Sequence, residues 1–344
     1  MAKIAINGFG RIGRSFFRAA FAVPSESLAK EGLFLDIIAV NDLSDTKTLA
    51  YLLKYDSVYG RYQKEVSASD GELIVDGKKI KVLAEKEPAK LPWKELGVDI
   101  VVESTGFFAD GEKAKAHLDA GAKRVVITAP ASGEVTTALI GVNDDVFEKG
   151  AGPITCNASC TTNSVAPVVE IIREALGIKK AVMTTVHGYT ATQKLVDAPD
   201  TKDVRRGRAA AVNIVPSTTG AAEAVIQSIP EMKGIFDALS MRVPVLTGSL
   251  SDTTMLVSRK TSVEEVNDVF RKAAQNPRWS KILQVTEDPL VSTDIIGQPY
   301  GAIVDLSLTK VVDGDLIKVF SWYDNEAGYT ATLVEHVRRV AQNL

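Results

Sequence analysis

Cysteine is the scarcest residue of this chain, with two copies among 344 residues. Two thiols are too few for a disulfide framework, and their scarcity favours a reducing compartment. Long apolar runs are missing too, since no stretch approaches the roughly 20 residues that a membrane helix needs. The opening segment, MAKIAINGFGRIGR, has neither the apolar core nor the cleavage site of a signal peptide. We therefore expect a cytoplasmic protein with no membrane partner.

A marked excess of charge is also absent. The formal net charge is −3, and the basic residues are scattered along the chain. This argues against a nucleic-acid partner, which would require a concentrated basic patch. The composition is that of an ordinary globular protein, with 45% hydrophobic and 24% charged residues. Because a single core stops growing near roughly 250–300 residues, we expect two domains.

The first half of the sequence alternates short apolar runs with helical patterns. The runs are rich in valine and isoleucine, as is typical of strands buried on both faces. Helical segments such as 13–21 and 111–121 lie between them, and this alternation predicts an α/β fold with a doubly wound parallel sheet. The expected strands are KIAI (3–6), DIIAV (36–40), ELIV (72–75), KIKVL (79–83), DIVVEST (99–105) and RVVITA (124–129).

The second half has longer strands with more alternation between polar and apolar residues. They follow a helix that begins just after Cys160 and ends at Gly177. This pattern predicts an antiparallel or mixed sheet with one face covered by helices. A closing helical segment at 329–344 is expected to pack on the first domain. The expected strands are AVMTTVHGY (181–189), ALSMRVPV (238–245), SDTTMLVSRK (251–260) and the stretch 302–324, which turns at Asp313-Gly314.

A glycine-rich loop follows the first expected strand and opens a helix. Its spacing is G-x-G-x-x-G, with glycines at 8, 10 and 13. In such loops the first glycine permits a tight turn and the second lets the backbone approach a pyrophosphate. The third lets the helix pack on the strand, and the helix N-terminus offers N–H groups to the phosphates. A chance cluster of glycines is the alternative, but the strand–loop–helix context predicts dinucleotide binding.

Asp42 is the candidate ribose-binding carboxylate. It follows the strand DIIAV, further from Gly13 than the roughly 20 residues that the fingerprint expects. The polar stretch PSESLAKEG (24–32) accounts for the excess by lengthening the connection. A carboxylate at this place accepts bonds from ribose hydroxyls and repels a 2′-phosphate, which favours NAD over NADP. The alternative is an aspartate that only stabilises a turn.

Cys160 lies at the expected N-terminus of a helix, where the dipole and free N–H groups lower a thiol pKa. His187 ends an apolar strand and heads a polar loop, so it is the candidate base. His117 lies on a helical surface pattern and His336 on the last helix, and we expect both in structural or solvated positions. A small buried cysteine without chemistry remains the alternative. The polar neighbours of Cys160 make a packed core less suitable there: Ser159, Thr161, Thr162 and Asn163.

Nine motifs occur in order across essentially the whole chain: INGFGRIGR, VNDL, KYDSVYGR, ESTG, NASCTTN, TTVHGYTATQK, RRGRAAAVNIVPSTTGAA, MRVPV and WYDNEAGY. Together they resemble the phosphorylating glyceraldehyde-3-phosphate dehydrogenases of the glycolytic, NAD-dependent type. The resemblance implies a Rossmann NAD-binding domain (1–159, completed by 325–344) and an α+β catalytic domain (160–324). It also implies a homotetramer and, as ligands, a triose phosphate and inorganic phosphate, with no metal.

By resemblance, the Cys160 thiolate attacks the aldehyde and His187 takes the proton of the resulting hemithioacetal. Oxidation leaves a thioester, and phosphate attacks it to release 1,3-bisphosphoglycerate. The remaining site residues are also assigned by resemblance. Those for NAD are Gly8, Gly10, Arg11, Ile12, Gly13, Asp42, Lys86, Thr128 and Asn325. Those for the substrate phosphate are Arg242 and Thr190, those for the attacking phosphate are Ser159, Thr161, Thr219 and Gly220, and Arg206 is placed more loosely near the substrate pocket.

The sequence departs from the family pattern at two positions. Ser164 stands where members commonly carry a second cysteine, and Thr192 where many bacterial relatives have aspartate. Cys156, four residues before Cys160, is expected as a buried thiol, with a disulfide to Cys160 as the alternative.

Two rival functions stay open. Erythrose-4-phosphate dehydrogenase shares the cysteine, the histidine and the fold, but that branch typically has glutamate at the position of Asp42 and lacks the pair Thr219-Gly220. An inactive NAD-binding module is the other rival, and it would be expected to lose some of these residues.

Overall fold

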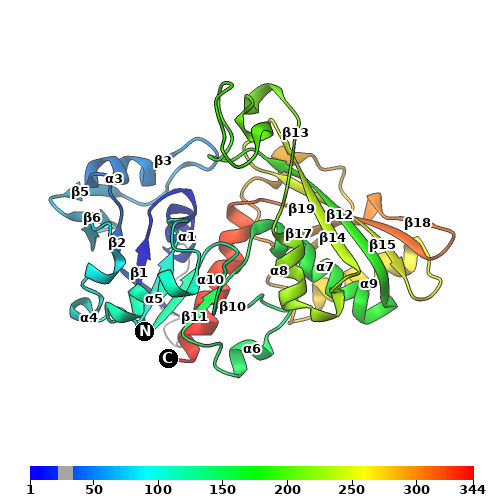
Figure 1. Ribbon diagram of the computed structural model, residues 1–344, viewed down its shortest axis with the longest axis horizontal. Helices are drawn as coiled ribbons and strands as arrows, with labels where there is room; N and C mark the ends of the chain where they lie inside the picture. The colour runs from blue at the N-terminus through cyan, green and yellow to red at the C-terminus, as the bar shows by residue number, and fades with distance from the viewer. Residues whose placement is uncertain (22–33) are drawn as a thin grey trace. The chain divides into compact units, whose positions relative to one another are not determined.

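The computed structural model describes residues 1–21 and 34–344 (Figure 1). The expected extension PSESLAKEG lies almost wholly outside the described residues. Contacts divide the chain into two compact units. Unit 1 comprises Met1–Ala138, Asp144–Ala158 and Leu333–Leu344, and unit 2 comprises Leu139–Asn143 and Ser159–Thr332. Compared with the expected boundaries, Ser159 and residues 325–332 belong to unit 2.

Unit 1 contains a nine-stranded sheet in the order β10-β11-β9-β8-β1-β2-β7-β6-β5. All neighbours from β10 to β7 pair in parallel, as expected for an α/β sheet. The central strands are valine- and isoleucine-rich and fully buried, for example β8. The strands are β1 (Ala2–Asn7), β2 (Leu35–Asn41), β5 (Val66–Ser69), β6 (Glu72–Val75), β7 (Lys78–Leu83), β8 (Ile100–Glu103), β9 (Arg124–Ile127), β10 (Thr136–Thr137) and β11 (Ile154–Cys156).

The edge of this sheet corrects one expectation. β6 and β7 were expected to be parallel strands buried on both faces. β7 does pair in parallel with β2, but β5, β6 and β7 form an antiparallel meander. Side chains of β6 alternate between buried and half-buried positions, so only one face is covered. The turn at Asp76-Gly77 has positive φ at both residues (46° and 78°), which is the geometry of a tight hairpin. Asp-Gly between two short apolar runs was the available signal.

Two helices of unit 1 have well-defined starts, and one of them follows the glycine loop. α1 begins at Arg11, directly after this loop, and buries Phe16 and Phe17. α5 is capped by Asp110, whose carboxylate accepts bonds from the N–H groups of Glu112 and Lys113. The helices are α1 (Arg11–Phe21), α3 (Thr46–Lys54), α4 (Trp93–Leu96), α5 (Gly111–Asp119) and α6 (Asp145–Glu148), with the 3₁₀ turn η1 (Pro88–Lys90) and the hairpin of β3 (Tyr55–Asp56) and β4 (Gly60–Arg61).

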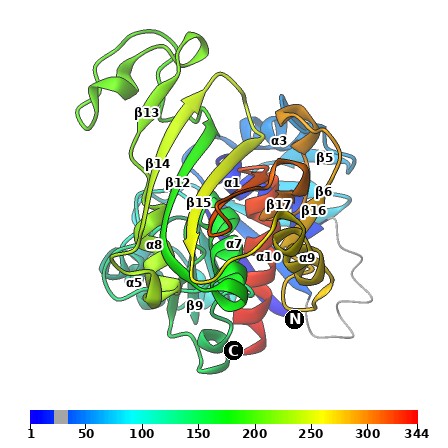
Figure 2. The ribbon, with the colours of Figure 1, turned by 90° about the vertical axis from the view of Figure 1, so that its right-hand side faces the viewer.

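Unit 2 contains a mixed eight-stranded sheet, as expected. The order is β13-β14-β12-β15-β19-β17-β16, with β18 paired to β19. β12 pairs with β14 in parallel and with β15 in antiparallel orientation, and the three strands lie side by side in Figure 2. The strands are β12 (Ile178–Gly188), β13 (Val215–Ser217), β14 (Phe236–Val243), β15 (Ser249–Val257), β16 (Leu283–Thr286), β17 (Ala302–Asp305), β18 (Lys310–Val312) and β19 (Leu316–Tyr323).

Helices cover one face of this sheet. α7 contacts β12, β15, β17 and β19, while α8 contacts β14 and α9 contacts β16. β15 alternates strictly between buried and half-buried residues, and Val182 and Leu239 are exposed. The helices are α7 (Cys160–Leu176), α8 (Ala221–Ser228) and α9 (Val263–Gln275), with 3₁₀ turns η2 (Val204–Gly207), η3 (Ala210–Val212), η4 (Pro230–Met232), η5 (Ser292–Ile295) and η6 (Leu306–Leu308).

The last helix, α10 (Ala327–Gln342), contributes its C-terminal part to unit 1. There His336 is fully buried, with Nε2 2.7 Å from Thr155 Oγ1 and Nδ1 3.1 Å from Ala138 O. The Ala138 carbonyl can only accept, so Nδ1 carries the proton and Nε2 accepts from the threonine hydroxyl. Burial lowers the pKa of His336 to about 3. The structural role expected for this histidine fits a neutral, buried imidazole.

Within the described residues, none of the helices combines the length and apolar character required to cross a bilayer.

Candidate active site

Cys160 is the first residue of α7, and Ser159 caps that helix. The Ser159 backbone is extended, and its Oγ accepts a bond from the Thr162 N–H at 3.0 Å. This is the usual arrangement of a serine N-cap, so the local sequence Ser-Cys-Thr-Thr determines where the helix starts. Cys160 is partly exposed and its thiol is free. The helix begins at Cys160 itself, one residue earlier than expected.

His187 lies near the end of β12, and α7, which begins at Cys160, packs on this strand. The Nε2 atom of His187 lies 3.3 Å from Cys160 Sγ, within hydrogen-bond distance for sulfur. Its Nδ1 lies 2.6 Å from the carbonyl oxygen of Gly188. A backbone carbonyl therefore holds the ring, and Nε2 faces the thiol as a base should. The imidazole is 3% exposed, so solvent does not compete for this contact.

Arg242 is the register partner of His187 on the neighbouring parallel strand. Its Nη1 lies 2.5 Å from His187 Nδ1 and donates to Gly188 O at 3.2 Å. The Arg242 Nε is buried and has no hydrogen-bond partner among the described residues. Burial lowers the pKa of Arg242, with Arg206 acting in the same direction and Cys160 and Tyr323 in the opposite direction. A buried guanidinium with an unused N–H suits an anion.

Burial opposes the charged forms of both members of the pair. Burial, and then the charge of Arg242, lower the pKa of His187 to about 3. Burial around the sulfur raises the pKa of the Cys160 thiol, although Arg242 and a bond from Thr161 act in the opposite direction. Burial therefore opposes the lowering of the thiol pKa that is expected from the helix N-terminus.

Tyr323 contacts His187 and two threonines beside the site, and the sequence analysis did not identify it. Its hydroxyl lies 3.0 Å from Thr161 Oγ1 and 2.6 Å from Thr185 Oγ1. Its ring packs edge-on against the His187 imidazole, with centroids 5.9 Å apart. Burial raises the pKa of Tyr323, so the phenol stays neutral. The motif WYDNEAGY contained this residue, but nothing local indicated that the ring would lie under the histidine.

Ser164, the departure from the family pattern, belongs to a buried row of serine hydroxyls. Its Oγ lies 2.9 Å from Ser321 Oγ and accepts a bond from Ser251 at 3.4 Å. All three residues are at most 1% exposed. A hydroxyl therefore fills this position with its hydrogen bonds satisfied.

The other expected anion-binding residues of unit 2 lie at loop ends and helix starts. Thr190 follows β12, and its Oγ1 lies 2.9 Å from Thr192 Oγ1. Thr219 Oγ1 accepts a bond from Ala221 N, and Gly220 caps α8. Thr161 is 4% exposed, with its hydroxyl engaged by Tyr323. Arg206 lies in η2, where its charge reaches Arg242.

The glycine loop of unit 1 has the geometry expected for a dinucleotide site. A Cβ at Gly8 (φ +91°) would lie 2.6 Å from Thr105 N, and a Cβ at Gly13 would lie 2.2 Å from Gly8 O. A Cβ at Gly10 would have no described heavy atom within 4 Å. The first and third glycines are therefore required by close packing, while the second faces open space. The loop fits a pyrophosphate approaching the backbone at Gly10.

Asp42 is tied to this loop by its carboxylate. Oδ2 accepts from Phe9 N and Oδ1 from Ser44 N, both at 2.9 Å. The Arg11 side chain forms an ion pair with Asp56 at 3.1 Å. The guanidinium is therefore engaged there, and the part of Arg11 that can contribute to the glycine loop is its backbone. Backbone N–H groups of Tyr59 and Val58, together with Arg11, hold the pKa of Asp56 below its ordinary value despite burial.

The other expected cofactor residues are spread over both units. Ile12 follows Arg11 in the first turn of α1, Lys86 is exposed, and Thr128 follows β9. Asn325, in unit 2, is 5% exposed and accepts a bond from Ser249 Oγ at 2.8 Å.

His117 is fully buried, which differs from its surface pattern and fits the structural position of the two that were expected. The indole N–H of Trp93 donates to His117 Nδ1 at 3.0 Å, and His117 Nε2 lies 3.0 Å from Glu103 Oε2. Because an indole can only donate, Nδ1 accepts and Nε2 carries the proton that it donates to Glu103. The next residue, Ser104, donates to Gly8 O at 2.6 Å. This buried network therefore supports the strand end beside the glycine loop.

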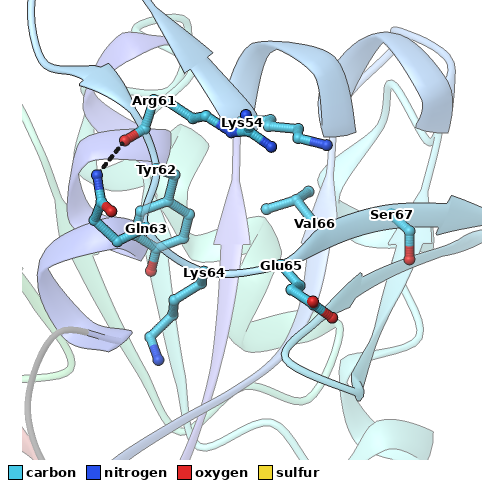
Figure 3. A pocket seen from close by; sticks show the side chains of 8 residues that line it. All are labelled: Lys54, Arg61, Tyr62, Gln63, Lys64, Glu65, Val66 and Ser67. Atoms are coloured by element: carbon cyan, nitrogen blue, oxygen red, sulfur yellow. Dashed lines mark hydrogen bonds between the residues drawn. The ribbon is translucent and has the colours of Figure 1, made fainter.

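A separate cavity of ≈ 570 Å³ opens in unit 1 (Figure 3). It holds none of the expected site residues, and its Lys64 is paired with Asp76 at 2.7 Å. Its lining consists of Lys54, Arg61, Tyr62, Gln63, Lys64, Glu65, Val66 and Ser67. Among the described residues there is no group of three His, Cys, Asp or Glu side chains that could hold a metal ion.

Comparison with known proteins agrees with both units. Residues 2–111 match the domain family described as glyceraldehyde 3-phosphate dehydrogenase, NAD binding domain. Residues 159–325 match the family described as glyceraldehyde 3-phosphate dehydrogenase, C-terminal domain. Glyceraldehyde-3-phosphate dehydrogenase 2 of Streptomyces arenae is 50% identical over 342 residues, covering 99% of each chain. The Thermotoga maritima glyceraldehyde-3-phosphate dehydrogenase is 51% identical over 335 residues, covering 97% of this chain and 98% of the relative.

Proposed function

The chain belongs to the glyceraldehyde-3-phosphate dehydrogenase family, and from this premise we propose that it converts glyceraldehyde 3-phosphate, inorganic phosphate and NAD to 1,3-bisphosphoglycerate. The observation that carries the proposal is the contact of 3.3 Å between Cys160 Sγ and His187 Nε2, beside Arg242. Nucleophile, base and a guanidinium short of negative charge come from three different elements of unit 2. This combination suits a covalent reaction on an anionic aldehyde.

The first step forms a bond between Cys160 Sγ and the aldehyde carbon. The thiol proton passes to His187 Nε2, which returns it to the former carbonyl oxygen, so a hemithioacetal forms and His187 is neutral again. In the free protein burial, and then the charge of Arg242, lower the pKa of His187. A substrate phosphate placed against Arg242 offsets this charge, so His187 becomes a stronger base when the substrate is in place. Binding of the phosphate and activation of the nucleophile are thereby linked.

His187 then takes the hydroxyl proton while the hemithioacetal is oxidised to a thioester. NAD, when bound, supplies the hydride acceptor for this oxidation. Inorganic phosphate attacks the thioester carbon, the bond to Sγ breaks, and the acyl phosphate leaves. Ser159, Thr219 and Gly220 are assigned to the attacking phosphate. The Thr161 hydroxyl is engaged by Tyr323, so we assign its backbone N–H in the first turn of α7.

The cofactor is held by unit 1. Gly10 leaves room for the pyrophosphate, and the backbone at Arg11 and Ile12 opens α1 toward it. Asp42 is assigned to the ribose hydroxyls, where a carboxylate repels a 2′-phosphate and favours NAD over NADP. Lys86, Thr128 and Asn325 are proposed as further cofactor contacts. Unit 1 is thus the cofactor domain and unit 2 the catalytic domain.

We also propose a homotetramer. Five large apolar side chains between residues 189 and 216 of unit 2 are exposed, from 70% for Ile214 to 84% for Leu195. Such a concentration of exposed apolar residues is typical of an interface. The remaining members are Val196, Val204 and Val212. Light scattering after size-exclusion chromatography tests the assembly, and a monomeric mass would contradict it.

Two free cysteines, one of them reactive, suit a reducing cytoplasm.

The test of the reaction is NADH formation by the purified protein with glyceraldehyde 3-phosphate, measured with and without inorganic phosphate. We expect turnover that requires phosphate, or arsenate in its place. Preference for erythrose 4-phosphate without a phosphate requirement would instead assign the chain to the erythrose-4-phosphate branch. NAD binding without turnover of either aldehyde would contradict the proposed activity.

A further inference from the structure

Gln193 closes a hydrogen-bonded turn with Thr190, directly after β12. Thr190 N donates to Gln193 Oε1 at 2.8 Å, and Gln193 N donates to Thr190 O at 3.0 Å. The Thr190 hydroxyl donates to the same Gln193 Oε1 at 3.2 Å. Gln193 is 8% exposed, whereas its neighbour Thr192 is exposed. The amide is therefore folded inward and serves the turn rather than the solvent.

The hydroxyl proton of Thr190 can change its acceptor without breaking the turn. A carbonyl oxygen has two lone pairs, and Gln193 Oε1 uses them for the N–H and the hydroxyl of Thr190. Thr192 Oγ1, 2.9 Å from Thr190 Oγ1, can donate to it. If an oxyanion takes the Thr190 hydroxyl proton, the bond from Thr190 N to Gln193 still holds the turn. Thr190 can thus redirect its hydroxyl without losing its position.

The pairing of β12 with β14 places this turn and Arg242 at the same edge of the sheet. His187 and Arg242 are register partners on parallel strands, and their side chains touch. Carboxyl ends of parallel neighbours lie at the same edge of a sheet, and Thr190 is three residues beyond His187. Turn and guanidinium therefore belong to one edge of unit 2.

We propose that Gln193 is a positioning residue for the phosphate group of the aldehyde substrate. Its neutral amide fixes Thr190, which directs its hydroxyl to the phosphate held by Arg242. This proposal rests on the proposed function, because it deepens the assignment of that phosphate site. An amide suits the task better than a carboxylate, which would accept the same two bonds but place a negative charge beside a dianion.

Two substitutions separate these contributions. Gln193→Leu keeps the size of the side chain and removes the acceptor. Gln193→Glu keeps the acceptor and adds a charge. Gln284→Leu is the matched control, because Gln284 is an exposed residue of β16 whose side chain also accepts a backbone N–H. Circular dichroism melts verify that all three variants fold.

The assay compares kcat and KM for glyceraldehyde 3-phosphate with those for D-glyceraldehyde, which lacks the phosphate. Gln193→Leu leaves Thr190 without the acceptor that positions it, so its hydroxyl bond to the charged phosphate is lost and we expect KM for the phosphorylated aldehyde to rise roughly tenfold. The kcat/KM for D-glyceraldehyde and the KM for inorganic phosphate should stay within about twofold of wild type. Gln193→Glu should raise KM further at low salt, and added salt should reduce that excess. Gln284→Leu should match wild type in every parameter.

The outcomes distinguish this inference from the proposed function. Equal losses on both aldehydes in Gln193→Leu would show a merely structural role and overturn the inference, as would wild-type KM values in both Gln193 variants. In each case a wild-type enzyme that prefers the phosphorylated aldehyde leaves the proposed function standing. A wild-type enzyme with no such preference would overturn the proposed function and this inference together.

Discussion

Replacing Gly10 and Gly13 in turn by alanine should separate cofactor binding from stability. A Cβ at Gly13 would lie 2.2 Å from the carbonyl oxygen of Gly8 and 3.1 Å from Ser104 Oγ. Contacts between a Cβ and a backbone oxygen do not occur at 2.2 Å, so α1 must move away from the loop in Gly13→Ala. Overpacking of this kind costs about 1–3 kcal/mol.

Gly10→Ala is the matched substitution with the opposite expectation. No described heavy atom lies within 4 Å of a Cβ at this position, and the residue lies immediately before α1. Losing the flexibility of glycine stabilises a chain by roughly 0.4–1 kcal/mol. Alanine is a poorer helix cap than glycine by a similar amount, about 0.5–1 kcal/mol, so the stability should hardly change. The methyl group would instead occupy the space through which a pyrophosphate approaches.

Calorimetric titration with NAD and thermal unfolding followed by circular dichroism measure the two effects. We expect Gly10→Ala to bind NAD at least about tenfold more weakly, which corresponds to roughly 1.4 kcal/mol. Its unfolding midpoint should be that of wild type, whereas Gly13→Ala should unfold several degrees lower, at about 2–4 °C per kcal/mol for a domain of this size. Wild-type NAD affinity in Gly10→Ala would refute the assigned path of the pyrophosphate. Wild-type stability in Gly13→Ala would refute the close contact of α1 with the loop.

Three further predictions concern Cys160, His336 and Tyr323. Cys160→Ser should abolish NADH formation while Cys156→Ser retains it, and iodoacetamide should label Cys160 before Cys156, because Cys156 is fully buried. His336→Gln should make the protein less sensitive to acid. The folded pKa of about 3 lies below the ordinary value of 6.5, so the unfolded chain binds the proton first. The contribution of neutral His336 to the free energy of unfolding is full above pH 6.5 and is lost as pH falls toward 3, by about 2 kcal/mol at pH 5. Tyr323→Phe should lower the free energy of unfolding by about 1–3 kcal/mol, because two buried threonine hydroxyls lose their partner.

Each of these has a contradicting result. Equal labelling rates of the two cysteines would count against an accessible, reactive Cys160. Urea unfolding of wild type and His336→Gln at pH 7.5 and pH 5 measures the acid effect, and parallel losses in both would exclude His336 as its source. For Tyr323→Phe, urea unfolding at one pH suffices, and an unchanged midpoint would mean that the hydroxyls of Thr161 and Thr185 find other partners.

Local patterns in the sequence were sufficient for much of the fold. Apolar runs and glycines located the parallel core of unit 1, because a buried strand and a tight turn each restrict which residues are allowed. The same reasoning failed for β6 and β7, where short apolar runs were taken as strands buried on both faces. Whether such a run lies in the centre or at the edge of a sheet depends on its neighbours, which periodicity does not specify.

Motif and resemblance indicated which residues to examine, and the family assignment followed from them. Cys160 and His187 could be singled out from local features, a thiol at a helix start and a histidine at a strand end, whereas Arg242 was assigned by resemblance. Their individual roles remain proposals.

The tertiary structure alone decided how these groups act on one another. Only the pairing of β12 with β14 sets Arg242 against His187, and only folding buries the thiol deeply enough to raise its pKa. The sequence by itself determined the elements, the glycine loop and the family. The burial of the site and the contact of Tyr323 with Thr161 depend on residues far apart in the chain. The bond of Gln193 to Thr190 depends on the direction in which its side chain turns. Electrostatic and hydrogen-bond energies depend on such distances, and distances exist only once the chain has folded.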